Sequence, residues 1–349
     1  MIGQSNFMQK KDMVRNMKNF YAKIKVPCIA AVALLMLLSF FACTGGSGEN
    51  PSGNNSGNNS GNNGQSISDQ TPGTPDSDTA SLPNVPASDK FSKFDTTIAY
   101  DRGTAVTVTL KDGGSAANGP GVSIEGDRVT IGAAGTYILT GTLSNGQIIV
   151  AVEKTEKVQL VLENVNVTSN TTAPLYVMSA DKVALTLAGG SINTFTDASN
   201  YTEQDEKENP NACIFSKDDL TINGYGALKV TGNFNNGIST KKDLKIVSGT
   251  IEVSAKNNAI RGKKSVQINS GTITVNSEDD GIKASETENP AKGFILIEGG
   301  DITVTAADDA LQAVTGITIS GGKVTTYAEG KSVNCDENVV IANGCLVEK

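Results

Sequence analysis

The sequence predicts an all-β fold, a parallel β-helix built from coils of about 22 residues. Short strands with alternating apolar residues recur along the second half of the chain, and a glycine follows each strand. In each strand the two apolar residues are two positions apart, so both face the same side. The six clearest strands are 220–222, 244–246, 266–268, 295–297, 317–319 and 339–341, and the glycines are Gly224, Gly249, Gly271, Gly300, Gly322 and Gly344.

The spacing of these strands sets the size of one coil. Ile246 and Ile268 are separated by one repeat, as are Ile297 and Ile319, while the step from Ile268 to Ile297 is longer because 285–292 is inserted. Each repeat is too small to hold a core alone, so successive coils must stack, at roughly 4.8 Å, and bury a shared apolar interior. No segment carries a helical apolar period of useful length.

The upstream sequence continues this pattern with looser spacing, so we expect residues 91–349 to form one β-helix domain. Residues 91–155 are expected to be its N-terminal coils or a capping sandwich, and a small separate β-domain is the alternative. The segment 197–210 reads as an acidic insertion in an upstream coil.

The first 90 residues are expected to be a targeting signal and a linker rather than part of a folded domain. Basic residues precede a short apolar run at 29–41, which ends at Ala42 and Cys43. We expect 1–43 to be a lipoprotein signal peptide with Cys43 as the lipid-accepting residue; ordinary cleavage near Ala42 is the alternative. Residues 44–90 are low in complexity and predict a disordered linker. The expected location is the bacterial cell envelope, at the outer membrane or cell surface, with membrane contact through the lipid anchor only.

The composition excludes several classes of function. The formal net charge of -8 argues against nucleic-acid binding. The absence of histidine removes Ser-His-Asp and Cys-His nucleophile pairs and histidine metal sites. The absence of tryptophan argues against a flat aromatic platform. Cys213, Cys335 and Cys345 lack metal-site spacing, so we expect either a Cys335–Cys345 bridge or buried thiols. A monomer is expected.

A recurring turn carries the candidate chemistry. Equivalent turn positions stack in a β-helix, so carboxylates one coil apart become neighbours. At roughly 4.8 Å and an effective dielectric constant near 20, a pair of like charges costs about 3 kcal/mol. Calcium is the natural counter-ion because it takes carboxylate, amide and carbonyl oxygens. The turns are Asn235-Asn236, Asn257-Asn258, Asp279-Asp280 and Asp308-Asp309. We expect calcium at Asp279, Asp280, Asp308 and Asp309, with Asn257 and Asn258 as neighbouring ligands.

A structural role for these turns is the competing interpretation, because Asn and Asp favour such turns for backbone reasons. We favour that interpretation for Asn235 and Asn236, and calcium for the aspartates. Arg261 and Lys283 lie two positions past the turns. They are expected to bind a sugar carboxylate. The alternatives are that they are solvated charges neutralising the aspartates, or that Lys283 is a catalytic base.

With these residues in view, the chain resembles the bacterial carbohydrate-binding β-helix family of the clostridial cellulose- and pectin-binding type. The resemblance implies a right-handed parallel β-helix with bound calcium and affinity for acidic plant polysaccharide and cellulose. It also implies a fold shared with the family-nine polysaccharide lyases, which use calcium and a lysine base. The stretches that carry it are 135–150, 171–177, 180–183, 211–224, 235–238, 279–283 and 293–300.

The function we expect is non-catalytic, calcium-dependent binding of polysaccharide at the cell surface, with acidic pectin-like polymers or cellulose as ligands. An acidic protein repels a polyanion unless a cation bridges them, and calcium would supply that bridge. One alternative is a polysaccharide lyase that uses calcium and Lys283. The other is a purely structural or adhesive surface solenoid.

Overall fold

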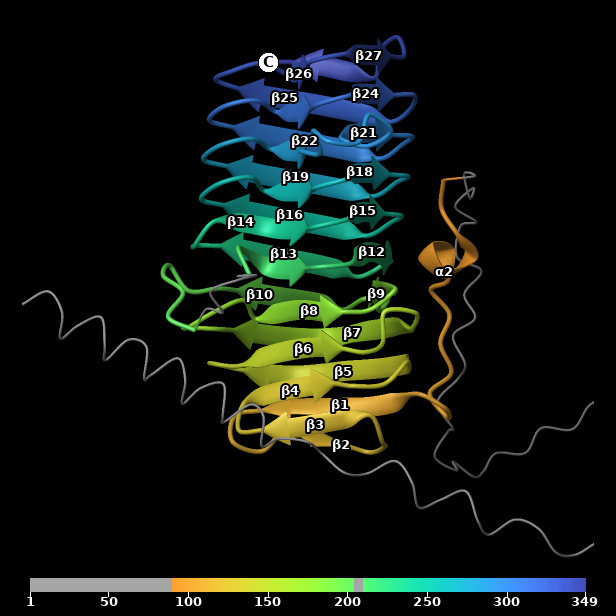
Figure 1. The fold of residues 1–349 in the computed structure, drawn as a ribbon, viewed down its shortest axis with the longest axis vertical. Coiled ribbons are helices and arrows are strands. Elements are labelled where there is room, and N and C mark those ends of the chain that lie inside the picture. The colour runs from red at the N-terminus through yellow and green to blue at the C-terminus, as the bar shows by residue number, and fades with distance from the viewer. Residues whose placement is uncertain (1–89, 204–209) are drawn as a thin grey trace, which may run out of the picture. The chain divides into compact units, whose positions relative to one another are not determined.

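The computed structural model describes residues 90–203 and 210–349, which form a parallel β-helix (Figure 1). The predicted signal peptide, Cys43 and the linker lie outside the described residues, apart from Lys90. Each complete coil contributes three strands, one to each of three parallel faces, which we call face 1, face 2 and face 3. The chain passes from face 3 to face 1 to face 2 and then enters the next coil. The predicted fold class is therefore confirmed.

Face 1 follows face 3 along the chain. It contains the strands that were predicted most clearly from sequence. In stacking order it contains β1 (Val106–Lys111), β5 (Gly135–Leu143), β7 (Lys157–Thr168), β9 (Lys182–Leu187), β12 (Asp219–Gly224), β15 (Asp243–Ile246), β18 (Ser265–Ile268), β21 (Phe294–Ile297), β24 (Gly316–Ile319) and β27 (Asn338–Ile341).

Face 2 begins on the later halves of β5 and β7, which bend from one face to the next. It continues through β10 (Ile192–Thr196), β13 (Ala227–Gly232), β16 (Thr250–Ala255), β19 (Thr272–Ser277), β22 (Asp301–Ala306), β25 (Lys323–Ala328) and β28 (Leu346–Glu348).

Face 3 has the shortest strands in the later coils. It stacks β4 (Arg128–Ile131), β6 (Gln147–Ala151), β8 (Leu175–Ser179), β11 (Ala212–Ser216), β14 (Asn236–Thr240), β17 (Ile260–Gly262), β20 (Ile282–Ala284), β23 (Leu311–Ala313) and β26 (Val333–Cys335).

The strand register matches the spacing predicted from sequence. Ile260 lies opposite Ile238 and Ile282, which are one repeat before and one repeat after it, and Ile268 pairs with Ile297 across the longer step. All five side chains are almost fully buried. Inward β-branched residues stack coil upon coil because a pleated strand sends alternate side chains to one side. The inserted residues therefore lie outside the repeating core.

The glycine after each face 1 strand is required by the backbone. Gly224 has φ of +99°, a conformation that other residues rarely adopt, and a Cβ there would lie 2.2 Å from the carbonyl oxygen of Leu187 in the coil below. Gly249, Gly271 and Gly300 also have positive φ. The recurring glycine thus marks the bend between face 1 and face 2.

The N-terminal end of the stack is covered by antiparallel strands. β2 (Ala116–Ala117) pairs with β1, and β3 (Val122–Glu125) pairs with β4, while β1 and β4 stack on β5 and β6. Antiparallel strands of this kind shield an edge that would otherwise offer unpaired backbone groups. Residues 106–151 therefore continue the solenoid and close it.

Residues 91–105 form a strap along the outside of face 1 rather than a coil. The strap contains the short helix α2 (Lys93–Thr96), which begins at a capping box made by Ser92 and Asp95. Asp95 is buried and accepts hydrogen bonds from Lys182 on β9 and Thr221 on β12, both at 2.6 Å, and from Lys245 on β15 at 3.2 Å. The strap is thus fixed to three successive coils. No helix in the described residues is long and apolar enough to cross a membrane.

The cysteines of the described residues are free thiols. Cys213 and Cys345 are buried and Cys335 is half-buried. Of the two sequence-based alternatives, the Cys335–Cys345 bridge is therefore not formed.

Candidate functional site

The Asn and Asp turns join face 2 to face 3, and they stack in a single column. The backbone N–H of Gly237 donates to the carbonyl oxygen of Asn258 at 3.1 Å, and that of Ala259 donates to Asp280 at 3.2 Å. The N–H of Gly281 continues the series by donating to Asp309 at 2.9 Å. Turns that are one full coil apart in sequence are therefore immediate neighbours in space.

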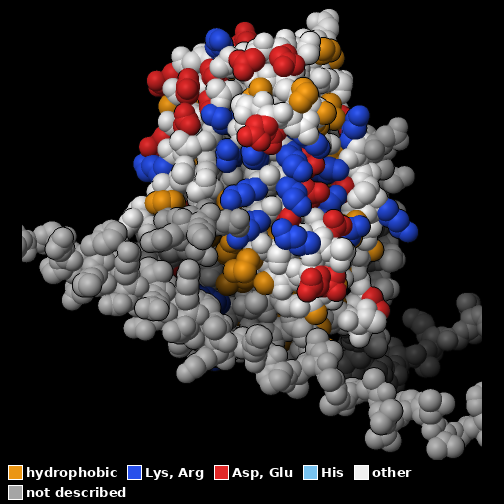
Figure 2. Space-filling view, in the orientation of Figure 1, with side chains coloured by type: hydrophobic (Ala, Val, Ile, Leu, Met, Phe, Trp, Pro, Cys, Tyr) orange, Lys and Arg blue, Asp and Glu red, His pale blue; other side chains and the backbone are white. Residues whose placement is uncertain are grey.

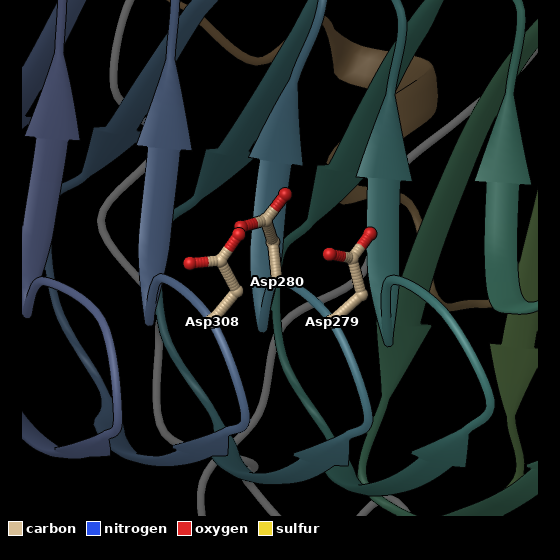
Figure 3. A group of neighbouring side chains, drawn as sticks. All are labelled: Asp279, Asp280 and Asp308. Carbon is tan, nitrogen blue, oxygen red and sulfur yellow. The ribbon is translucent and has the colours of Figure 1, made fainter.

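Three of the predicted carboxylates meet in this column. Asp279, Asp280 and Asp308 each offer a carboxylate oxygen, and these oxygens lie within 4.8 Å of one another. Figure 3 shows the three side chains projecting from two adjacent turns, with the Asp280 and Asp308 carboxylates turned toward each other. Asp280 is buried, Asp279 is half-buried and Asp308 is exposed. The cluster is therefore anchored in the protein and open to solvent on one side.

Asp280 is the electrostatic centre of this cluster. Its carboxylate accepts a hydrogen bond from the Lys283 ammonium at 2.7 Å and another from the backbone N–H of Asp309 at 3.2 Å. Burial raises the pKa of Asp280 above its ordinary value and the charge of Asp279 adds to this, while the hydrogen bond from Lys283 opposes it. Lys283 thus balances the charge of Asp280, one of the three carboxylates in the cluster.

Asp309 is oriented differently from the other three aspartates. Its carboxylate accepts hydrogen bonds from the backbone N–H of Lys331 at 2.8 Å and from the amide of Asn334 at 2.5 Å. It does not belong to the group of mutually close carboxylates. Asp309 therefore stabilises the turn of the following coil by accepting hydrogen bonds from it.

The asparagine pair one coil below the aspartates is partly satisfied. The amide nitrogen of Asn258 donates to Asn236 at 3.0 Å and to Asn257, but its carbonyl oxygen is buried and has no hydrogen-bond partner among the described residues. A buried acceptor without a partner carries a desolvation cost of about 1–3 kcal/mol. This oxygen belongs to the turn one coil below that of Asp280.

Arg261 and Lys283 form the basic part of face 3. They lie opposite each other in register on β17 and β20. The Arg261 guanidinium donates to the Ser285 hydroxyl at 2.8 Å, and burial lowers its pKa. The same outward column continues through Gln312 and Asn334 on one side, and through Ser239, Phe215 and Tyr176 on the other.

A groove on the other side of the same turns was not predicted from sequence. It has a volume of about 310 Å³ and runs across several coils along the end of face 2. Its signal in the sequence is a recurrence of small polar residues at one register position, namely Thr231, Ser254, Asn276 and Thr305. The remaining residues that line it are Gly232, Asn233, Ala255, Lys256, Ser277 and Glu278. The groove therefore offers a ligand both apolar carbon surface and hydroxyl or amide groups.

The fold and site together define a β-helix protein that presents an open, polar and charged surface along its axis. The chain belongs to the family described as carbohydrate-binding domain-containing protein, which matches residues 125–345.

Two relatives support this membership. A carbohydrate-binding domain-containing protein of Acetivibrio thermocellus is 47% identical over 142 residues, which are 40% of this chain and 50% of that protein. The chain thus matches about half the length of this relative. The solved structure described as the polysaccharide lyase-like protein from C. thermocellum, gadolinium derivative, aligns with a TM-score of 0.68 and 42% identity. That alignment covers 70% of this chain and 99% of the other.

These likenesses establish carbohydrate binding as the family character and a fold shared with a polysaccharide lyase-like protein. The resemblance noted from the sequence is confirmed at that level.

Proposed function

We propose that this protein binds polysaccharide at the bacterial cell surface without cleaving it, and that calcium at Asp279, Asp280 and Asp308 mediates the binding. The observation that carries the proposal is the meeting of three carboxylates on stacked turns, within 4.8 Å of one another and open to solvent. Three acidic groups at this distance repel one another unless a cation is shared between them.

The residues present fit calcium. Ca²⁺ takes six to eight oxygen ligands and accepts both carboxylates and amide carbonyls. Asp279, Asp280 and Asp308 would supply carboxylate oxygens, and the unpartnered carbonyl oxygen of Asn258 is the nearest orphan acceptor in the column. Asp309 and Asn257 are engaged with other partners, so we assign them to supporting the turns. The ion would supply positive charge to an acidic ligand.

Acidic, pectin-like polymers are the preferred ligand class. A protein with net charge -8 repels a polyuronate unless local positive charge overcomes the repulsion. Calcium would provide such charge at the turns, and Arg261 and Lys283 provide it on face 3. Cellulose is the second choice, because the chain has no tryptophan to stack on a neutral sugar surface.

The position of Lys283 supports binding over catalysis. A general base needs a free lone pair, and the Lys283 nitrogen is donating a hydrogen bond to Asp280. The lyase is nevertheless the second candidate function, because the aligned solved structure is described as polysaccharide lyase-like. A bound ion that drew Asp280 away would release Lys283, so the activity has to be tested with calcium present.

We also propose attachment to the membrane through a lipid on Cys43. The basic segment, the short apolar run and the cysteine at its end support this anchor. Partition into the detergent phase of Triton X-114 tests it. The full chain should enter the detergent phase and the Cys43→Ala variant should not; equal partition of the two would contradict the anchor.

Retention on immobilised polygalacturonate, with calcium or with a chelator, tests the binding proposal. We expect strong retention in calcium and much weaker retention in chelator, and the double variant Asp279→Asn/Asp308→Asn should behave in calcium as the wild type does in chelator. Asp301→Asn, an exposed carboxylate on β22, is the control and should bind normally. Equal retention of wild type in both conditions would contradict calcium mediation. Release of unsaturated uronate product, measured by absorbance, would contradict non-catalytic binding and support the lyase function.

A further inference from the structure

A second charged column lies at the opposite edge of face 3, on the turns that lead to face 1. Lys217, Lys241 and Lys263 occupy equivalent positions in three successive coils, and Lys242 and Lys264 form the neighbouring column. The backbone N–H of Lys263 donates to Thr240 at 2.9 Å, and that of Lys264 donates to Lys242 at 3.1 Å, which fixes the stacking. We call these five residues the lysine ladder.

The lysine ladder is only partly neutralised by the protein. Lys242 pairs with Asp218 at 2.6 Å, and Lys263 pairs with Glu286 at 3.4 Å. Lys241 and Lys264 form no ion pair with any residue that the structure describes. Figure 2 shows Lys and Arg side chains gathered at the middle of the molecule, with fewer Asp and Glu side chains among them. A protein with an overall charge of -8 thus keeps a basic surface on one corner.

The ladder spans three successive coils, so the backbone positions of its lysines recur about every 4.8 Å along the solenoid axis. Parallel ammonium groups at that spacing repel one another, and salt reduces this repulsion without abolishing it. A ligand that presents one negative charge after another along an extended chain would relieve it. Arg261 and Lys283 extend the positive surface from the ladder across the short strands of face 3 toward the aspartate cluster.

We propose that the lysine ladder binds the carboxylate groups of an acidic polysaccharide directly, without calcium, with the polymer lying along the solenoid axis. Successive uronate residues would then meet successive coils. The inference rests on the proposed polysaccharide binding and names a second contact for it, with a different chemistry. Calcium bridging belongs to the aspartate edge of face 3 and direct ion pairing to the lysine edge.

Binding to polygalacturonate in the presence of a chelator isolates this contact. We compare the wild type with Lys241→Gln/Lys264→Gln, which removes the two unpaired ammonium groups. Lys111→Gln/Lys323→Gln is the matched control, because it makes the same change in net charge at exposed lysines on β1 and β25. Circular dichroism and thermal melting of each variant establish that the fold is retained.

The wild type should keep a weak, salt-sensitive affinity in chelator. The ladder variant should lose about tenfold of it, and the control about twofold or less. Fully methyl-esterified polygalacturonate, which carries no charge, should bind neither protein in chelator. Equal affinity of wild type and ladder variant, or equal binding of the esterified polymer, would overturn the inference.

The same comparison in calcium separates this inference from the proposed function. The ladder assignment alone fails if two results occur together. The wild type shows calcium-dependent binding, and in chelator the ladder variant binds as tightly as the wild type. Vesicles of phosphatidylglycerol test an anionic lipid surface as the alternative ligand. Tighter binding to those vesicles than to polygalacturonate, lost in the ladder variant, would overturn the assignment to a glycan.

Discussion

Lys283 and Asp280 form an ion pair of 2.7 Å, three positions apart in sequence, in which the aspartate side chain is only 1% exposed. This pair joins the acidic turn column to the basic outer side of face 3. It balances one of the three clustered carboxylates and leaves Asp279 and Asp308 to a cation from solution.

Removal of Lys283 should destabilise the protein in the absence of divalent ions. Lys283→Met leaves the Asp280 carboxylate buried beside Asp279, and we expect a loss of about 1–2 kcal/mol in the free energy of unfolding. Urea denaturation in chelator measures it. Calcium should reduce this loss, because the ion would neutralise Asp280 in place of the lysine. Lys229→Met, in an exposed pair with Glu252, is the control and should change stability by less than about 0.5 kcal/mol.

Calcium should stabilise the folded protein. A ligand at a hundred times its dissociation constant adds about 2.7 kcal/mol, which corresponds to a rise in Tm of about 5–10 °C for a domain of this size. Thermal melting with calcium and with chelator measures the shift. Asp279→Asn/Asp308→Asn should show little shift and Asp301→Asn the full one. An undiminished shift in Tm in the double variant would show that calcium does not bind at this site.

The strap should depend on Asp95. Burial raises the pKa of Asp95, but hydrogen bonds from Lys182, Thr221 and Ser92 outweigh burial and leave it below its ordinary value. The stabilisation is therefore present above the ordinary carboxyl pKa and lost as the pH falls through the lowered one. Asp95→Asn should cost about 3 kcal/mol at pH 7, and the difference from wild type should shrink below about pH 4.

Urea denaturation at pH 7 and pH 3 measures this effect. Asp101→Asn, which changes an exposed carboxyl on the same strap, should cost less than about 1 kcal/mol at both pH values. A constant difference between Asp95→Asn and wild type across the range would show that Asp95 contributes as a neutral hydrogen-bond acceptor.

Asp197 should give the opposite pH dependence. Burial raises its pKa to about 6, although Tyr201 and backbone N–H groups donate to its carboxylate. The folded state then binds the proton more tightly than the unfolded state, so stability is lost as the pH rises from about 4 to about 6.

The stability of wild type minus that of Asp197→Asn should therefore fall by about 2–3 kcal/mol between pH 4 and pH 7. Taking the difference cancels the other carboxyls whose pKa is raised, Asp219 and Asp280. A difference that does not vary with pH would mean that Asp197 is ionised in the folded protein throughout this range.

The stacking of coils was predictable because it follows from side-chain period and repeat length. Ile238, Ile260 and Ile282 reveal the register in the sequence, since only one alignment buries all of them. The meeting of Asp279, Asp280 and Asp308 follows from the same register. The divergence of Asp309 does not, because it depends on donors supplied by Lys331 and Asn334 in a coil whose turn lacks the Asn or Asp pair.

Structural features that do not recur from coil to coil could not be predicted from the sequence. The strap rests on the contact of Asp95 with Lys182, Thr221 and Lys245, which are distant along the chain and share no pattern with it. The lysine ladder, by contrast, does repeat, in three successive coils. It was missed because surface lysines are common, and their significance appears only when their ion pairs are known.

A crystal structure determined with calcium tests the central claim most directly. We expect an ion bound by carboxylate oxygens of Asp279, Asp280 and Asp308 together, with the Lys283 ammonium no longer at hydrogen-bond distance from the oxygen that the ion takes. An ion bound elsewhere, or three carboxylates that keep their positions at millimolar calcium with no ion between them, would contradict the account.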